Sequence, residues 1–159
     1  MELSLGAWGW DQKWAEQLGA LPAGSSVGRV VGQERTRWDI QTAHGLELAR
    51  IPSATKQELY PVVGDWALVK PGPMPSDPWS ILAVLPRRTW FSRGAALTGA
   101  TEQVLAANID TVWIAHGLDR PLNPRSIERY LALAWESGAV PEIVLTKADL
   151  AELLEPTIA

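Results

Sequence analysis

Three polar side chains follow a short apolar segment near the end of the printed sequence. Thr146, Lys147 and Asp149 come just after Ile143-Val-Leu145, an apolar run that is too short for a helix. Such a run is typical of a strand in a parallel sheet that is covered on both faces. Because ligands of these sheets lie outside the carboxyl ends of the strands, we expect the three side chains to meet a ligand there.

The carboxylate of Asp149 has the chemistry to tell one purine from another. When ionised it accepts two parallel hydrogen bonds, and guanine offers a matching pair of donors in its ring N–H and its exocyclic amino group. Adenine offers no such pair and would leave the carboxylate unpaired, which is costly. Lys147 would lay its methylene stem along the base and tie neighbouring loops together. Thr146 would brace the loop with a bond from its side chain to the backbone.

Two interpretations of these residues stay open on the tetrapeptide alone. The pattern Asn/Thr-Lys-x-Asp is the guanine-reading motif of GTP-binding domains, but four residues make a loose pattern. Lys147 and Asp149 are equally compatible with the solvated first turn of a helix, which Leu150-Ala-Glu-Leu-Leu154 suggests. The elements that surround the motif have to decide between them.

A β-α-β unit is predicted to position the motif. Residues 111–115 read as a strand, Asn123 as a helix N-cap and Pro124 as the first helical residue. Gly138 is placed to end the helix in the left-handed conformation, and the strand at 140–145 follows. An apolar stripe on the helix suits packing on a sheet; it comprises Ile127, Tyr130, Leu131 and Ala134. We expect parallel pairing with a right-handed crossover. His116, which closes the first strand, is interpreted as a hydrogen-bonded strand-end residue rather than as a catalyst.

Five short strands between Gly and Pro turns precede this unit, at 28–32, 35–42, 46–51, 65–69 and 81–85. This count is typical of the OB-fold, a small barrel that often binds oligonucleotides. Trp38 shares a predicted face with Ile40, so we place it in the core. Arg35 and Arg37 lie on the opposite face, where they are candidates for RNA phosphate contacts or members of an ordinary solvated surface.

Two flanking segments carry aromatic and basic residues. In residues 1–27, Trp10, Trp14 and Leu18 recur every four residues, which predicts a short helix docked through its indoles rather than a platform for bases. The second segment, at 87–100, contains Arg87, Arg88 and Arg93 beside two aromatic residues. These arginines are candidates for RNA contacts. Alternatively, they form ion pairs with the acidic second half of the chain, after residue 93.

Charge and composition narrow the class of protein. Residues 1–93 hold 10 basic and 9 acidic side chains, whereas the remainder holds 4 and 9. Apolar residues make up 47% and charged residues 20% of the 159, as in soluble globular proteins. No apolar run is long enough to span a membrane, and the N-terminus lacks a secretory signal pattern. The absence of cysteine excludes disulfides and thiolate metal sites. We expect a cytoplasmic monomer without a metal site.

Longer motifs resemble the ribosome small-subunit-dependent GTPase family of the RsgA type. The resemblance covers about Gly28 to Leu150 and rests on Leu85-Pro-Arg-Arg-Thr89, Phe91-Ser-Arg93, Glu102-Gln-Val-Leu-Ala-Ala-Asn-Ile-Asp110, Leu118-Asp119, Ile127-Glu-Arg-Tyr-Leu-Ala-Leu-Ala-Trp-Glu-Ser-Gly138 and Leu145-Thr-Lys-Ala-Asp-Leu150. It implies an all-β OB-fold barrel followed by the first part of an α/β, P-loop GTPase-like, circularly permuted domain. It further implies GTP binding and hydrolysis in late maturation of the small ribosomal subunit, with ribosomal RNA as a partner. The family's guanine-binding residues correspond to Thr146, Lys147 and Asp149; Thr146 stands where Asn is the commoner residue in GTPases.

The sequence lacks a G-x-x-x-x-G-K-[ST] loop and a later Asp-containing motif for Mg²⁺. By the family's order these parts, and a C-terminal zinc-binding domain, follow Asp149. We therefore interpret the chain as an N-terminal fragment, with no catalytic residue and no cofactor of its own. GTP, GDP and Mg²⁺ would be bound by the full-length parent. The expected segments are an N-terminal extension at 1–27, a barrel at 28–86, a basic linker at 87–100 and a truncated GTPase domain at 101–159. We expect poor solubility or partial disorder after Arg93.

Two other interpretations stay open. In the first, the chain is a stand-alone RNA-binding adaptor that uses the barrel and Arg87, Arg88 and Arg93. In the second, it is a remnant without function that binds neither RNA nor nucleotide.

Overall fold

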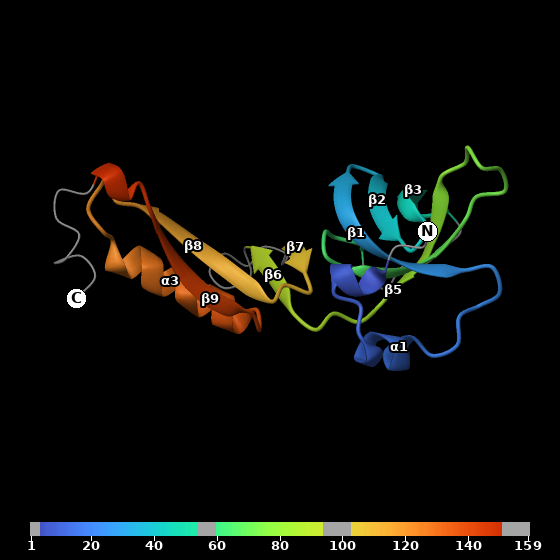
Figure 1. Cartoon of the computed structure of the whole chain (residues 1–159), viewed down its shortest axis with the longest axis horizontal. Coiled ribbons are helices and arrows are strands. Elements are labelled where there is room, and N and C mark those ends of the chain that lie inside the picture. The colour runs from blue at the N-terminus through green and yellow to red at the C-terminus, as the bar shows by residue number, and fades with distance from the viewer. Residues whose placement is uncertain (1–3, 54–59, 94–102, 151–159) are drawn as a thin grey trace. The chain divides into compact units, whose positions relative to one another are not determined.

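A computed structural model describes residues 4–53, 60–93 and 103–150 of the chain (Figure 1). The chain divides into two compact units. The first contains Met1–Arg87 and Val104–Asn108, and the second contains Arg88–Gln103 and Ile109–Ala159. The expected extension at 1–27 and the expected barrel at 28–86 thus lie in one unit. Within the described ranges, no helix combines the length and the apolar character needed to cross a membrane.

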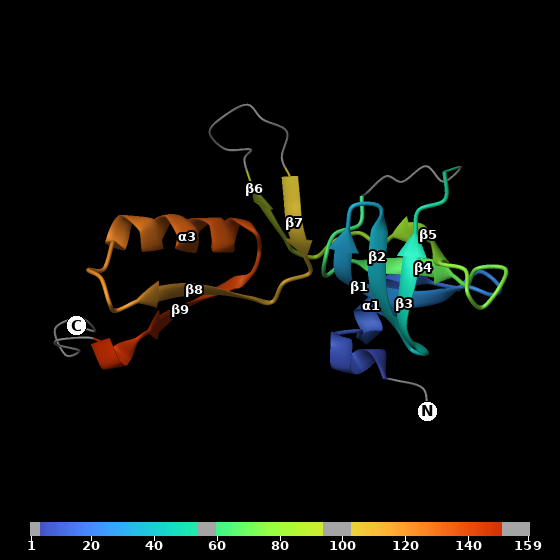
Figure 2. The same ribbon diagram turned by 90° about the horizontal axis from the view of Figure 1, so that it is seen from above.

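The first unit is built around a closed five-stranded barrel with the strand order β1-β2-β3-β5-β4 (Figure 2). Its strands are β1 (Ser26–Glu34), β2 (Arg37–Thr42), β3 (Gly45–Arg50), β4 (Trp66–Lys70) and β5 (Trp79–Val84). All neighbours pair antiparallel except β3 and β5, whose parallel pairing closes the barrel. The predicted OB-fold barrel and its five strands are confirmed.

In the hairpin formed by β1 and β2, the second strand begins two residues later than the sequence predicts, at Arg37 instead of Arg35. Arg35 and Thr36 form the turn, with Arg35 in the left-handed region at φ 53°, instead of starting the second strand. Positive φ is what a two-residue hairpin turn requires, and alternation alone does not reveal it. Alternation along this strand places Gln41 on the same solvent-facing side as Arg35 and Arg37, but Gln41 is buried.

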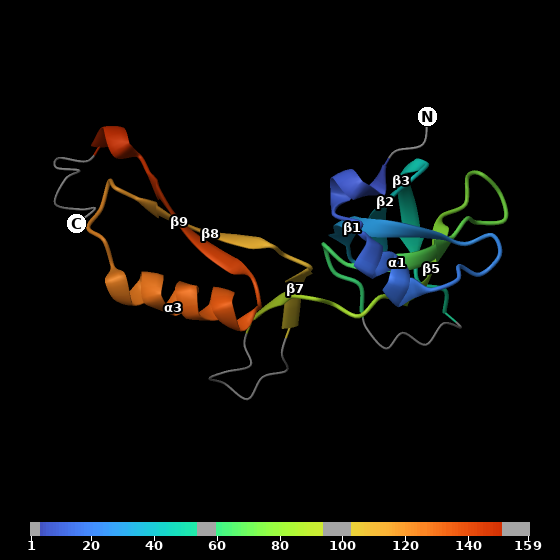
Figure 3. The ribbon, with the colours of Figure 1, turned by 60° about the horizontal axis from the view of Figure 1, so that its bottom comes forward.

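Two apolar clusters fill the first unit. One lies inside the barrel and includes Trp38 and Ile40, so the predicted core position of Trp38 is confirmed. The other joins the N-terminal helix α1 (Gln12–Leu18) to the barrel (Figure 3), with Trp14 packed against Trp66. Trp10 meets Trp66 edge to face at 4.7 Å between ring centroids. The N-terminal helix is therefore docked through Trp14, as predicted, but Trp10 precedes the helix and its N-cap Asp11 and packs on Trp66 from outside it.

A later segment of the chain, around β7 (Gln103–Ala107), returns to this unit. Ala106 forms a parallel bridge with Val63, and the N–H of Ala107 donates to the carbonyl of Val63 at 2.9 Å. Gly64, at φ 94°, passes so close that a Cβ there would collide with the carbonyl oxygen of Ala107. The Asn108 amide donates to the carbonyl of Gly64 at 3.0 Å. Residues 104–108 thus belong with the barrel rather than with the domain expected from residue 101 onward.

The second unit contains the predicted β-α-β arrangement. Strand β8 (Thr111–Gly117) pairs in parallel with β9 (Val140–Thr146), and helix α3 (Pro124–Glu136) connects them. Asn123 caps α3 by accepting the N–H of Ser126, and Gly138 adopts φ 83° just after it. The second unit also contains β6 (Trp90–Arg93) and a short 3-10 turn, η2 (Ala148–Leu150). A similar turn in the first unit, η1 (Leu5–Trp8), precedes α1.

Helix α3 runs along β8 and β9 and covers one face of their sheet (Figure 2). Ala134 and Ile114 are buried at this contact. The expectation that the strand at 140–145 is covered on both faces is wrong for the described residues: Val140 is 63% and Ile143 48% exposed, and the neighbouring Trp113 is 72% exposed.

Residues 103–150 nevertheless form regular strands and a helix. The expected disorder after Arg93 otherwise falls on 94–102 and 151–159, outside the described residues.

Candidate functional site

Thr146, Lys147 and Asp149 lie together at the carboxyl end of β9, and all three are exposed. The neighbouring β8 runs parallel to β9, with Gly117 opposite Thr146, so both strands end at the same edge of the sheet. The hydroxyl of Thr146 donates to the carbonyl oxygen of His116 at 3.3 Å. This is the kind of bond from side chain to backbone that the sequence predicts for a loop brace.

Lys147 joins the two strand ends. Its ammonium donates to Oδ2 of Asp119 at 2.5 Å, and Asp119 lies in the loop that follows β8. The hydrogen bond and the positive charge of Lys147 lower the pKa of the Asp119 carboxyl below its ordinary value, with a smaller contribution in the same direction from Arg120. Lys147 itself has φ 56°, a left-handed conformation that is uncommon for a side chain of this kind.

Asp149 lies in the single turn of η2, where the N–H of Leu150 donates to the carbonyl of Lys147 at 3.0 Å. The turn carries the exposed carboxylate beyond the sheet edge. An exposed carboxylate in this position can accept hydrogen bonds from a planar ligand without first being released from the protein interior. The arrangement therefore leaves room for the purine contact predicted from the sequence, which stays a prediction.

His116 lines a cavity of about 730 Å³ between β8 and α3, together with Tyr130 and the polar side chains of Arg120, Asn123 and Ser126. The ring Nε2 of His116 is buried and has no hydrogen-bond partner among the described residues. The expected hydrogen-bonded ring is therefore not observed at this nitrogen; the backbone carbonyl of His116 is the group that forms a bond.

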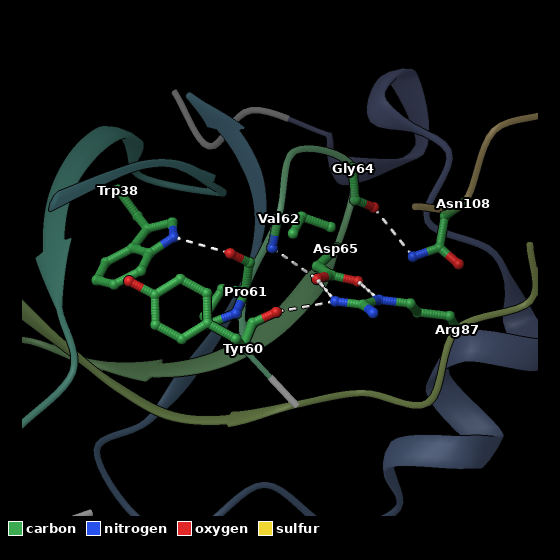
Figure 4. A network of polar contacts seen from close by, with 8 residues as sticks. All are labelled: Trp38, Tyr60, Pro61, Val62, Gly64, Asp65, Arg87 and Asn108. Carbon is green, nitrogen blue, oxygen red and sulfur yellow. Dashed lines mark hydrogen bonds and ion pairs between the residues drawn. The ribbon is translucent and has the colours of Figure 1, made fainter. Parts of the chain in front are cut away.

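The arginines predicted to contact RNA have different environments. The guanidinium of Arg87 is turned into the first unit (Figure 4), where its Nε and Nη2 donate to the carboxylate of Asp65, each at 2.8 Å. Arg35, Arg37 and Arg88 are exposed. The side chain of Arg93 lies outside the described residues. Arg87 thus has a structural partner within the barrel unit, and this pairing does not favour its use as an RNA contact.

Sequence reasoning singled out neither Asp65 nor Asp119. The sequence places Asp65 in a strand but does not indicate that it is fully buried. Asp119 belongs to one of the family motifs, and it follows a strand that is parallel to the one before Thr146. The rule that ligand-proximal groups gather at the carboxyl ends of parallel strands could have found it. Among residues 4–53, 60–93 and 103–150, no three His, Asp or Glu side chains are grouped as metal ligands.

Comparison with known proteins gives the same family that the motifs indicate. Residues 84–158 match the family model described as RsgA GTPase. The small ribosomal subunit biogenesis GTPase RsgA of Streptomyces coelicolor is 43% identical over 150 residues, which cover 92% of this chain and 40% of that protein. The protein of the same name from Xanthomonas axonopodis pv. citri is 42% identical over 164 residues, covering 94% of this chain and 40% of its own length.

Two solved structures have a similar fold. YloQ, described as a circularly permuted GTPase, superimposes with a TM-score of 0.65 at 16% identity, over 86% of this chain and 46% of that one. YjeQ from Thermotoga maritima gives 0.63 at 22% identity, over 84% and 45%. The chain spans about two fifths of the length of the curated relatives it matches. Over more than nine tenths of its own length the chain aligns with these RsgA proteins at 42–43% identity, which confirms the family resemblance read from its motifs.

Proposed function

We propose that the loop after β9 reads the guanine base of GTP and GDP, with Asp149 accepting the base's two donors. The observation that carries this proposal is the placement of the exposed Asp149 carboxylate at the carboxyl end of a parallel strand, beside a Lys147 that is anchored to the neighbouring loop. In this proposal Lys147 lies along the base and Thr146 holds the loop to β8. The adenine edge would leave the carboxylate unpaired, so adenine nucleotides are rejected.

The activity proposed for the whole protein is inferred from the names of its relatives. We infer that the chain acts as part of a GTP-hydrolysing factor in maturation of the small ribosomal subunit, in the cytoplasm and as a monomer. The name shared by the relatives, small ribosomal subunit biogenesis GTPase, supports the activity and the ribosomal partner in this inference. The phosphates and Mg²⁺ need a phosphate-binding loop, which the printed sequence does not contain. Zinc would belong to a part of the longer relatives that this chain does not match. By itself, the chain is therefore expected to bind nucleotide weakly and not to hydrolyse it.

A chimera provides the test, with this chain in place of the matching part of the Streptomyces coelicolor relative. In the chimera, Asp149→Asn should weaken GDP binding by roughly 100-fold or more, since the asparagine amide opposes the amino group of guanine. The same change should strengthen binding of xanthosine diphosphate, whose carbonyl at that position accepts a hydrogen bond. Both affinities are measured by titration with a fluorescent nucleotide.

Glu128→Gln is the matched control, because it removes the same charge from an exposed position on α3. It should change neither affinity. If Asp149→Asn leaves the preference for guanosine over xanthosine diphosphate unchanged, the guanine-reading role is refuted.

Ribosomal RNA is the second partner that we propose, with the barrel as the contact. The exposure of Arg35 at the β1–β2 turn and of Arg37 on β2 supports this proposal. RNA affinity of the chain should fall steeply with salt, and replacing both arginines with Ala should reduce the slope by about 1 for each lost phosphate contact. Arg125→Ala, at an exposed position of α3, is the control and should leave the slope unchanged. An unchanged slope in the double variant would exclude these two residues as phosphate contacts.

A further inference from the structure

We propose that Asp119 is a positioning residue for the guanine-reading loop: its ion pair with Lys147 holds the loop after β9 to the loop after β8. The inference rests on the proposed function of Lys147 and Asp149. It goes beyond that function because Asp119 touches no base in this role. It acts through Lys147: Oδ2 of Asp119 accepts a hydrogen bond from the Lys147 ammonium at 2.5 Å.

The backbone of Lys147 gives the first reason. A lysine at φ 56° is in a conformation that L side chains with a Cβ adopt at a cost. Such residues persist where the surrounding structure determines them. Both sides of Lys147 are held here: the carbonyl of the preceding Thr146 accepts the N–H of Leu118 at 2.9 Å, and its own carbonyl accepts the N–H of Leu150 at 3.0 Å. The ion pair adds a third attachment through the side chain.

Gly117 gives the second reason. A Cβ on this residue would collide with Oδ1 of Asp119 and would lie 3.4 Å from Cδ of Lys147. Residue 117 of β8 therefore has to lack a side chain for Asp119 and Lys147 to make contact. The Lys147 stem crosses the space above Gly117, and its direction is set by the carboxylate at the far side.

The charges around the pair favour this geometry. Arg120, the residue after Asp119, adds positive charge to the same loop and lowers the pKa of the Asp119 carboxyl in the same sense as Lys147. An Asp carboxyl is ionised at neutral pH even at its ordinary pKa of about 3.9, so it is available to the ammonium. Since the pair is partly exposed, with side chains 54% and 33% accessible, it contributes little to the stability of the whole unit. Its effect is local, on the loop that carries Asp149.

Amide hydrogen exchange of the isotope-labelled chain tests the inference without any nucleotide. Asp119→Asn should lower the protection of the Leu150 and Leu118 amides by roughly two- to five-fold, while amides in the middle of α3 stay unchanged. Glu128→Gln should change none of them. Asp119→Glu, which keeps the charge, should restore most of the protection; if it is as deprotected as the Asn variant, the ion pair does not hold the loop.

A double-mutant cycle decides whether Asp119 acts through Lys147. Asp119→Asn and Lys147→Gln are measured singly and together. Because each change removes the same contact, the double variant should lose little more protection at Leu150 than either single variant. Additive losses would overturn the inference.

This outcome is distinguishable from failure of the guanine-reading role. The cycle uses the chain alone, whereas the base preference is measured in the chimera with Asp149→Asn. In the chimera, Asp119→Asn should weaken GDP binding by roughly two- to five-fold without altering the preference between guanosine and xanthosine diphosphates, since it loosens the loop but keeps the Asp149 carboxylate that reads the base. A changed preference would contradict a purely positioning role.

Discussion

Arg87 and Asp65 form a two-pronged ion pair inside the first unit (Figure 4), with the Asp65 side chain fully buried and the Arg87 side chain 9% exposed. Both oxygens of Asp65 accept from Arg87, and Oδ2 accepts in addition the N–H of Val62 at 2.8 Å. Arg87 also donates to the carbonyl of Tyr60 at 2.9 Å. The pair therefore fixes the residues just before β4 to the segment that leaves the barrel after β5.

Removing one partner of this pair should destabilise the barrel unit strongly. Arg87→Ala leaves the Asp65 carboxylate buried without its cation, and breaking a buried pair in this way costs about 3–5 kcal/mol. Chemical denaturation followed by the tryptophan signal of the barrel measures the change. Arg37→Ala, at an exposed position on β2, is the control and should shift stability by about 0.5 kcal/mol or less. If Arg87→Ala unfolds no more easily than the control, the pair is not structural, and the RNA-contact hypothesis for Arg87 regains support.

The close approach of Gly64 to residue 107 makes a second prediction. Gly64→Ala introduces both a positive-φ strain and a collision with the carbonyl of Ala107, and should cost ~2 kcal/mol or more. Gly19 offers a matched control, because it also has positive φ but has no atom within 4 Å of a built Cβ. Gly19→Ala should therefore show only the conformational cost, about 1–3 kcal/mol at φ 67° and ψ −143°. Equal losses for the two variants would mean that residues 104–108 do not pack against Gly64.

The N-terminal helix gives a third prediction. Trp14 is 2% exposed and packs with Trp66, Val27 and Leu85, so Trp14→Ala should cost about 3–5 kcal/mol in the stability of the barrel unit. Trp8, which is 40% exposed, is the control, and its replacement by Ala should cost about 1 kcal/mol or less. A mild effect at Trp14 would show that α1 is not part of the barrel unit and would reopen the role of its indoles as a platform for bases.

Local patterns predicted most of the elements correctly. Alternating residues between Gly and Pro turns marked the barrel strands, and Asn123 and Gly138 marked the two ends of α3 because capping depends on neighbours a few residues away. The turn at Arg35 was missed because no glycine occupies its positive-φ position. Local chemistry therefore predicts an element best where the special residue type is present.

Contacts between distant residues were not predictable in this way. Asp65 and Arg87 are 22 positions apart, and from the sequence alone either residue is equally compatible with a solvated surface charge. Only the closed barrel brings them together. The return of residues 104–108 to the barrel unit likewise depends on Gly64, 43 positions before Ala107, and no periodic pattern records it. At the candidate site, the sequence identified the loop after β9 but not its partner Asp119, since the two loops meet only when the strands pair in parallel.

The ion pair between Lys147 and Asp119 makes a prediction about pH. A carboxyl whose pKa is lowered in the folded chain favours the folded state above the ordinary Asp pKa of about 3.9, and this contribution is lost as the pH falls through the lowered folded value. The carboxyl carbon of Asp119, followed by NMR while the chain remains folded, should therefore titrate below the ordinary value. The Leu150 amide should shift with the same midpoint, because the loop loosens when the carboxyl is protonated.

Two substitutions separate the causes of the lowered pKa. Lys147→Gln should move the midpoint of Asp119 up toward its ordinary value, because Lys147 supplies the hydrogen bond and a larger charge effect than Arg120. Arg120→Gln removes only a charge and should move the midpoint less. If the two variants shift it equally, the direct contact contributes nothing beyond general positive charge. In that case Asp119 cannot be the group that fixes the direction of the Lys147 side chain, and the anchoring of the loop has to come from the backbone bonds of Leu118 and Leu150 alone.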